Sequence, residues 1–64
     1  MERKNFAQLY IDNVYKGVIE VVRETNNFIE FKEMAHGLNV LYLPKREGIK
    51  VINFKNVEVW KENN

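Results

Sequence analysis

The chain has 64 residues, with ten Lys or Arg against nine Asp or Glu, so its formal net charge is only +1. This length predicts one domain, residues 1–64, whose single core is only marginally large enough. The near-zero charge excludes a whole-molecule field that would attract nucleic acid or an anionic membrane. The absence of Cys excludes disulfides and thiolate metal sites.

The sequence carries no signal for a membrane or for export. Its longest apolar run is a few residues, and Met1–Lys4 leads into no signal-peptide core. We therefore expect a soluble, cytoplasmic protein with no membrane partner. Because small domains that lack disulfides and metals commonly gain stability by association, we also expect a homo-oligomer.

The first segment, Phe6 to Ile11, fits two structures. A helical face would contain the spaced residues Phe6, Leu9, Tyr10 and Asn13. A strand that ends at Ile11 would instead be followed by a two-residue turn at Asp12-Asn13, because Asp and Asn tolerate the positive φ of the favoured hairpin turns. We prefer the hairpin, and the sequence leaves the helix open.

The middle of the chain is typical of β-structure. Val14 to Arg23 is rich in β-branched residues, and Gly17 within it predicts a bulge or sharp bend. Glu24 to Asn27 is a turn, and Phe28 to Met34 alternates apolar and charged residues as a half-buried strand does. Ala35 to Gly37 is expected to be a loop.

The last third of the chain predicts a hairpin and a closing strand. The apolar runs Val40–Leu43 and Ile49–Phe54 flank a polar tip at Lys45–Gly48. Lys55-Asn56 leaves room for a single tight turn before Val57–Lys61. In total, five to six short strands with almost no helix predict an all-β fold that curls into a small barrel.

Both faces of several predicted strands are apolar, although one small barrel has only one interior. We therefore expect a second copy of the chain to cover the other face. The residues expected in this self-association patch are Val18, Val22, Val40, Tyr42 and Val51. The alternative is that these are scattered surface residues, which are normal in soluble proteins.

Two segments carry a resemblance to known small barrels. LYIDNVYKGVIEVVRETNNFIEFKE resembles the opening of Sm-like (Hfq-like) proteins, and VINFKNVEVWKE resembles the close of SH3-like and Sm-like barrels. The resemblance implies a 3₁₀ turn near Lys55-Asn56 between the last two strands. The Lys45–Gly48 hairpin is extra to the Sm pattern, and no base-binding residue of the Hfq type has a match. In size and style, the chain also resembles short phage-encoded proteins that inhibit host machinery.

Residues able to perform catalysis are scarce. The chain has no Ser or Cys and one Thr, Thr25, which is expected in a turn. The remaining candidates are the carboxylate pairs Glu30/Glu33 and Glu58/Glu62, and a half metal site at Glu33/His36. Carboxylates on exposed strand faces are usually solvated charges, and two ligands do not make a metal site. We expect no enzyme activity, no cofactor and no metal.

Two groups of residues remain as candidates for binding. The basic tip contains Lys45, Arg46 and Lys50, and Tyr10, Tyr15, Tyr42 or Trp60 could stack on bases. The alternative is that a charged tip keeps the hairpin soluble. Trp60 would lie outside, beside Glu58, if Val57 and Val59 point inward, or else over the barrel mouth. An exposed Trp is typical of protein interfaces.

The leading functional prediction is a non-catalytic phage or mobile-element accessory protein, of the anti-defence kind, that inhibits or redirects a host protein by direct contact. The residues expected to contact that partner are Trp60, Lys45, Arg46 and Lys50. The alternative is an Sm-like protein that binds RNA or single-stranded DNA with the same basic tip.

Overall fold

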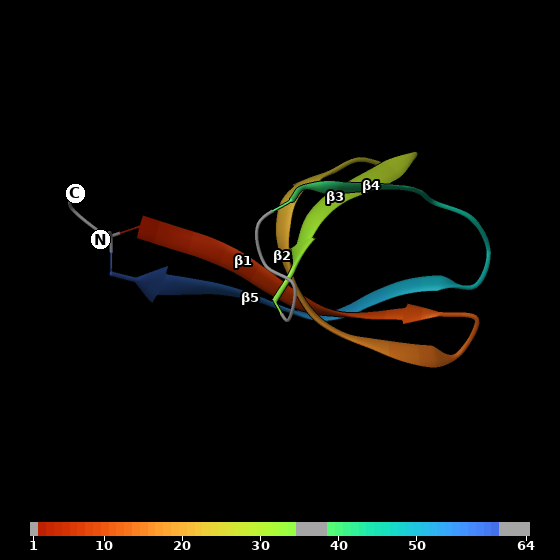
Figure 1. Ribbon diagram of the computed structural model, residues 1–64, viewed down its shortest axis with the longest axis horizontal. Helices are drawn as coiled ribbons and strands as arrows, with labels where there is room; N and C mark the ends of the chain where they lie inside the picture. Colours follow the sequence, from red (N-terminus) through yellow and green to blue (C-terminus); the bar gives the residue numbers. More distant parts are fainter. Residues whose placement is uncertain (1, 35–38, 61–64) are drawn as a thin grey trace.

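The computed structural model describes residues 2–34 and 39–60, which form one antiparallel sheet of five strands. The strands are β1 (Glu2–Ile11), β2 (Val14–Glu24), β3 (Phe28–Glu33), β4 (Leu41–Pro44) and β5 (Ile49–Val59). Their order across the sheet is β4-β3-β2-β1-β5. The sheet curls so that β3 and β4 lie over β1 and β5, but it does not close, since β4 and β5 are its two edges (Figure 1). The prediction of an all-β fold is confirmed.

The β1–β2 connection is a two-residue hairpin turn. Asp12 and Asn13 have φ angles of 51° and 67°, as a turn with positive φ at both central residues requires. Phe6 to Ile11 is therefore strand, and the helix alternative is wrong.

Strand β2 bends at two bulges, which carry it from one layer of the curled sheet to the other. Lys16 is the extra residue of the first, because Leu9 pairs with Gly17 and Tyr10 with Tyr15. Gly17 has a φ of 105°, so the predicted bend at this glycine is confirmed. A second register shift follows Val21 in the pairing of β2 with β3, and bulges of this kind increase local bending and twist.

The turn between β2 and β3 is closed by the one threonine of the chain. The hydroxyl of Thr25 accepts hydrogen bonds from the backbone N–H groups of Asn27 and Phe28, both at 3.2 Å. The Thr25 N–H donates to the carbonyl of Phe28 at 2.9 Å. The predicted turn at Glu24 to Asn27 is confirmed, whereas the expected loop at Ala35 to Gly37 lies outside the described residues.

The hairpin predicted around Lys45–Gly48 is wrong. β4 pairs with β3, and β5 pairs with β1, so residues 45–48 form a crossover between the two edges of the sheet. The error arises because two apolar runs that are adjacent in sequence can each pair with an earlier strand. β4 finds its partner in β3, and β5 finds its partner in β1.

The predicted turn at Lys55-Asn56 is also wrong. Both residues belong to β5 and pair with Phe6 and Asn5 of β1. The irregularity lies just before them, where Asn53 has a φ of 56° and the pairing with β1 shifts opposite Ala7. A bulge at Asn53 therefore keeps β5 a single strand.

The core occupies one face of the curled sheet, which we call the concave face. Its fully buried residues alternate along β1, β2 and β3 and are Ala7, Leu9, Ile19, Val21, Ile29 and Phe31. The half-buried residues Ile11, Leu43, Ile49 and Val51 pack against them. The opposite, convex face carries the alternate residues of the same strands.

One end of the molecule is a two-stranded arm. Glu2 to Lys4 of β1 pair with Val57 to Val59 of β5, whereas pairing with β2 begins only at Asn5. This arm projects from the curled body (Figure 1) and gives the chain its dimensions of 40 × 20 × 19 Å. A two-stranded ribbon has little stability of its own in water.

In residues 2–34 and 39–60 there is no helix of the length and apolarity that a bilayer requires.

Candidate binding surfaces

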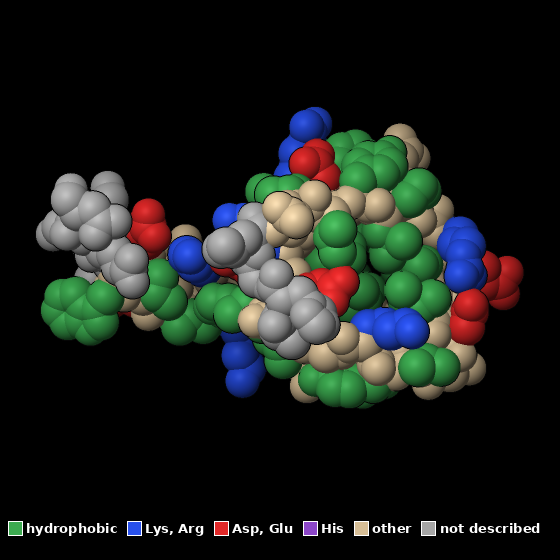
Figure 2. All heavy atoms as spheres, in the orientation of Figure 1, with side chains coloured by type: hydrophobic (Ala, Val, Ile, Leu, Met, Phe, Trp, Pro, Cys, Tyr) green, Lys and Arg blue, Asp and Glu red, His purple; other side chains and the backbone are tan. Residues whose placement is uncertain are grey.

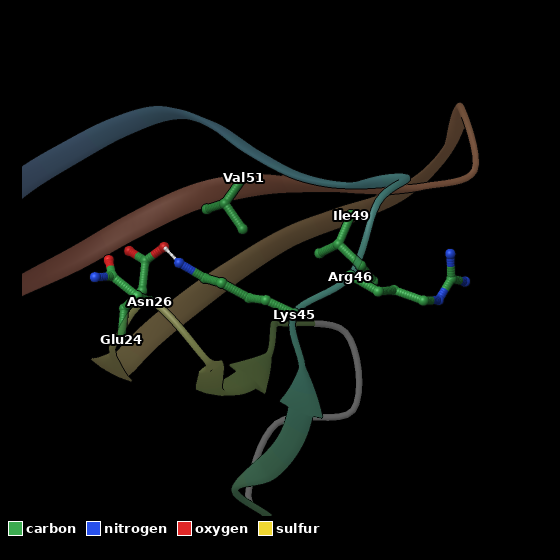
Figure 3. A pocket seen from close by; sticks show the side chains of 6 residues that line it. All are labelled: Glu24, Asn26, Lys45, Arg46, Ile49 and Val51. Atoms are coloured by element: carbon green, nitrogen blue, oxygen red, sulfur yellow. Dashed lines mark hydrogen bonds and ion pairs between the residues drawn. The ribbon is translucent and has the colours of Figure 1, made fainter.

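The crossover at residues 45–48 is held by two ion pairs. Nζ of Lys45 lies 2.6 Å from a carboxylate oxygen of Glu24, with both side chains about one third exposed. Arg46 donates to both carboxylate oxygens of Asp12 at 3.0 Å. Figure 3 shows the Lys45 side chain reaching toward Glu24 while Arg46 points away from it. We call these two pairs the crossover latch.

Backbone hydrogen bonds reinforce the latch. The N–H of Lys45 donates to the carbonyl of Asn27 at 2.9 Å, and the N–H of Asp12 donates to the carbonyl of Gly48 at 2.8 Å. The turn before β2 and the turn before β3 are thus each hydrogen-bonded to one end of the crossover. The crossover thus connects the sheet edges β4 and β5, which do not pair with each other.

The latch changes the electrostatics of the predicted basic tip. The hydrogen bond from Arg46, and then its charge, lower the pKa of the Asp12 carboxyl, and the same contacts raise the pKa of the Arg46 guanidinium. Lys45 is likewise paired with Glu24. Two of the three cations predicted to contact a partner therefore already have acidic partners within the chain.

The third cation, Lys50, lies beside tyrosine residues. Lys50 pairs with Tyr10 across β1 and β5, and Tyr10 pairs with Tyr15 across β1 and β2. The two tyrosine rings are 5.2 Å apart and tilted by 50°. The structure thus brings together three residues of the nucleic-acid hypothesis in one row, which we call the tyrosine row.

A second aromatic pair lies near the β4 edge. The rings of Phe28 and Tyr42 stack 5.0 Å apart, and the guanidinium of Arg23 lies 5.2 Å from the centre of the Phe28 ring. Arg23 also pairs with Glu30 at 4.0 Å. Sequence reasoning missed Arg23 and Phe28, because their proximity to Tyr42 depends on the pairing of β4 with β3.

The residues of the predicted self-association patch do not all lie on one face. Val18, Val22, Val40 and Tyr42 are exposed, with exposed fractions from 43% to 63%. Val51 pairs with the buried Leu9 and packs against the core on the concave face. The association itself stays a prediction.

Trp60, which directly follows β5, is 83% exposed. It lines a hollow of 490 Å³ together with three apolar residues, Phe6, Met34 and Val59. Lys4 and Glu20, an ion pair at 3.5 Å, and Glu2 complete the lining. We call this site the arm hollow.

The arm hollow and the crossover latch lie at opposite ends of the molecule. β5 runs from Ile49 beside the latch to Val59 beside Trp60, a span of about 33 Å at the rise of an extended strand. The structure therefore does not unite Trp60 and the basic tip in one contact surface, as the sequence-based prediction had them.

Metal and catalytic sites find no geometric support in the described part of the chain. No three His, Cys, Asp or Glu side chains in residues 2–34 and 39–60 are grouped to hold a metal ion. His36, half of the candidate pair with Glu33, lies outside the described residues. The Thr25 hydroxyl is engaged in the β2–β3 turn.

Comparison of the chain with protein-family models, with curated proteins and with solved structures gave no match. The resemblance to Sm-like and SH3-like barrels therefore stays a prediction. Proposals about function rest on the geometry of the chain itself.

Proposed function

We propose that this protein is a non-catalytic binding protein that contacts another protein through Trp60 and the arm hollow. The observation that carries the proposal is the 83% exposure of the Trp60 side chain beside a preformed hollow. Tryptophan supplies a large apolar surface and is enriched among the residues that dominate protein interfaces. Phe6 and Met34 in the hollow offer further apolar contact to an inserted partner side chain.

The charges favour a protein partner over a nucleic acid at this site. Lys4 is paired with Glu20, and Glu2 adds a negative charge to the same hollow. A phosphate backbone would meet net repulsion there. A partner with an apolar side chain flanked by Lys or Arg would meet complementary surface.

The biological role that we propose is that of an accessory protein, of phage or mobile-element origin, which inhibits or redirects a host protein by occupying its surface. A chain of 64 residues with an exposed aromatic anchor is suited to such steric action. The strand order β4-β3-β2-β1-β5 in a curled sheet supports an SH3-like or Sm-like barrel as its fold type. The free edges β4 and β5 and the exposed residues Val18, Val22, Val40 and Tyr42 support self-association.

The test is capture of partners from host lysate by the tagged protein, before and after nuclease treatment. Trp60→Ala should remove the captured protein, whereas Phe54→Ala, which truncates another exposed aromatic residue, should retain it. Circular dichroism confirms that both variants fold. Capture that survives Trp60→Ala, or capture of nucleic acid alone, would refute the proposal. Light scattering of the wild type gives the number of subunits.

A second candidate, binding of RNA or single-stranded DNA, is favoured by the tyrosine row. Tyr10 and Tyr15 present adjacent rings, and Lys50 lies opposite Tyr10 on the neighbouring strand. Bases stack on such rings while a cation contacts the phosphate. Fluorescence anisotropy with a labelled oligouridine tests this candidate: binding must weaken steeply as salt rises and must fall on Tyr10→Ala. Salt-independent binding would refute it.

A further inference from the structure

The concave face contains an unfilled apolar cavity of 480 Å³. Leu9, Ile19 and Phe31, all at least 95% buried, line it from the core, and Leu41 and Leu43 of β4 line it from the opposite layer. Figure 2 shows hydrophobic side chains gathered around a hollow in this half of the molecule, with basic and acidic side chains at its edge. The cavity is therefore open to solvent rather than sealed within the core.

Unequal strand lengths explain why the cavity stays open. β1 and β2 have 10 and 11 residues, whereas β3 and β4 have 6 and 4. β3 pairs with β2 only from Ile19 to Glu24. The first residues of β2, Val14 to Gly17, thus extend beyond the end of β3, and the interior opens on that side.

Two charged residues line the cavity with the apolar groups. Lys16, the extra residue of the first β2 bulge, is exposed, and Glu33 is half-buried at the end of β3. Neither forms an ion pair with any residue in the described ranges 2–34 and 39–60. The ammonium group of Lys16 is therefore available to an anion at the mouth of an apolar hollow.

We propose that this cavity binds a small amphipathic monocarboxylate, with its apolar part against the accessible wall residues Ile11, Leu41 and Leu43 and its carboxylate at Lys16. The volume falls within the range of about 300–1,000 Å³ that is typical of ligand pockets, which combine apolar walls with few polar groups. Glu33 disfavours a second negative charge on the ligand. This site is independent of the arm hollow, which lies on the convex side of the sheet.

A flat protein surface fits this cavity less well than a small molecule does. Covering the mouth with an apolar face would take the charges of Lys16 and Glu33 out of water without partners, which is costly. A ligand with a polar end fills the hollow and leaves both charges in contact with solvent.

The test is a titration of the ¹⁵N-labelled full chain, followed by NMR, with decanoate, decanol and decylamine below their aggregation concentrations. Decanoate should shift the amide signals of Leu9, Ile19 and Leu41 in a saturable manner and leave Val57 in the arm unchanged. It should bind more tightly than decanol and decylamine do.

Matched variants test the role of the charge. Lys16→Met should weaken decanoate binding up to about fivefold, the limit expected for an exposed charge contact, and leave decanol binding unchanged. Lys32→Met is the control, because Lys32 pairs with Glu20 on the convex face. Glu33→Gln should strengthen decanoate binding. Leu41, in the cavity wall, is 39% exposed. Leu41→Trp places a larger side chain there and should weaken the binding of all three probes.

Several results would overturn the proposal. These are the absence of saturable shifts, shifts confined to the convex face or the arm, and equal binding of decanoate and decylamine. If Lys16→Met leaves the affinity for decanoate unchanged, the proposed contact between the ligand carboxylate and Lys16 is wrong. If the cavity amides respond only to protein concentration, with a matching rise in mass, a second copy covers the cavity and the small-molecule site is wrong.

Discussion

Ile29→Val tests the assignment of the core to the concave face. Ile29 is fully buried, with 0% of its surface exposed, whereas Ile52 of β5 is 41% exposed. The same substitution at the two positions removes one methylene from a packed interior in one case and from a half-solvated surface in the other. The pair therefore compares the two faces of one sheet with identical chemistry.

The magnitudes separate the two variants. A buried Ile→Val change costs about 1 kcal/mol, and a surface change about 0.5 kcal/mol or less. In a domain of this size, 1 kcal/mol lowers Tm by about 4–8 °C. Ile29→Ala, at about 2–5 kcal/mol, would consume most of a total stability of about 3–5 kcal/mol and leave much of the protein unfolded.

Thermal unfolding followed by circular dichroism measures these effects. Ile29→Val should lower Tm at least twice as far as Ile52→Val does. Equal shifts, or a larger shift for Ile52→Val, would refute the assignment of the core to the concave face. The scans should be run at two protein concentrations. A shift for Ile52→Val that appears only at the higher concentration would show that a second copy covers the convex face.

Two further predictions concern the crossover latch. Gly48→Ala should destabilise the fold more than Gly17→Ala, as measured by urea unfolding. Both glycines have positive φ, at 94° and 105°, so each substitution carries a backbone strain of about 1 kcal/mol or more. A Cβ at Gly48 would also displace the Asp12 carboxylate from its contact with Arg46, whereas one at Gly17 meets nothing within 4 Å. Equal losses would contradict this. Asp12→Asn should remove a pH-dependent part of the stability. Because Arg46 lowers the pKa of Asp12 in the folded state, this part is fully present above the unfolded-state value of about 3.9 and is lost as the pH falls through the lower folded-state pKa. The wild type and Asp12→Asn should therefore converge in stability at acidic pH, and parallel curves down to pH values well below 3.9 would refute the role of the ion pair.

Local features of the fold were predictable from the sequence. The Asp12-Asn13 turn and the Gly17 bulge depend on residue types that tolerate positive φ, and the β3 alternation depends on the two-residue period of a strand. Non-local pairing was not predictable in this way. The apolar run before Lys45 and the run after it read as a hairpin because they are adjacent, and no local signal reports that each has a partner elsewhere in the sheet.

For the binding surfaces, too, local features were predictable from the sequence and non-local contacts were not. Trp60 is exposed, which was one of two positions considered for it, but the apolar residues around it, Phe6 and Met34, come from distant parts of the chain. The sequence did not show that two cations of the basic tip, Arg46 and Lys45, have acidic partners, because Asp12 and Glu24 approach them only when the sheet curls. Charge counted along a sequence does not show which charges are already paired.

The pairing of the first strand with the last has a consequence for folding kinetics. Ile11 pairs with Ile49, and Glu2 with Val59, so this ladder joins residues far apart in the chain, and such topologies fold on the millisecond to second timescale. At a synthesis rate of about 5–20 residues per second, β5 is synthesised several seconds after β1. Throughout that interval the β1 edge presents unpaired backbone groups to neighbouring nascent chains. Intermolecular strand pairing is therefore an expected hazard in producing this protein, and slower synthesis should increase it.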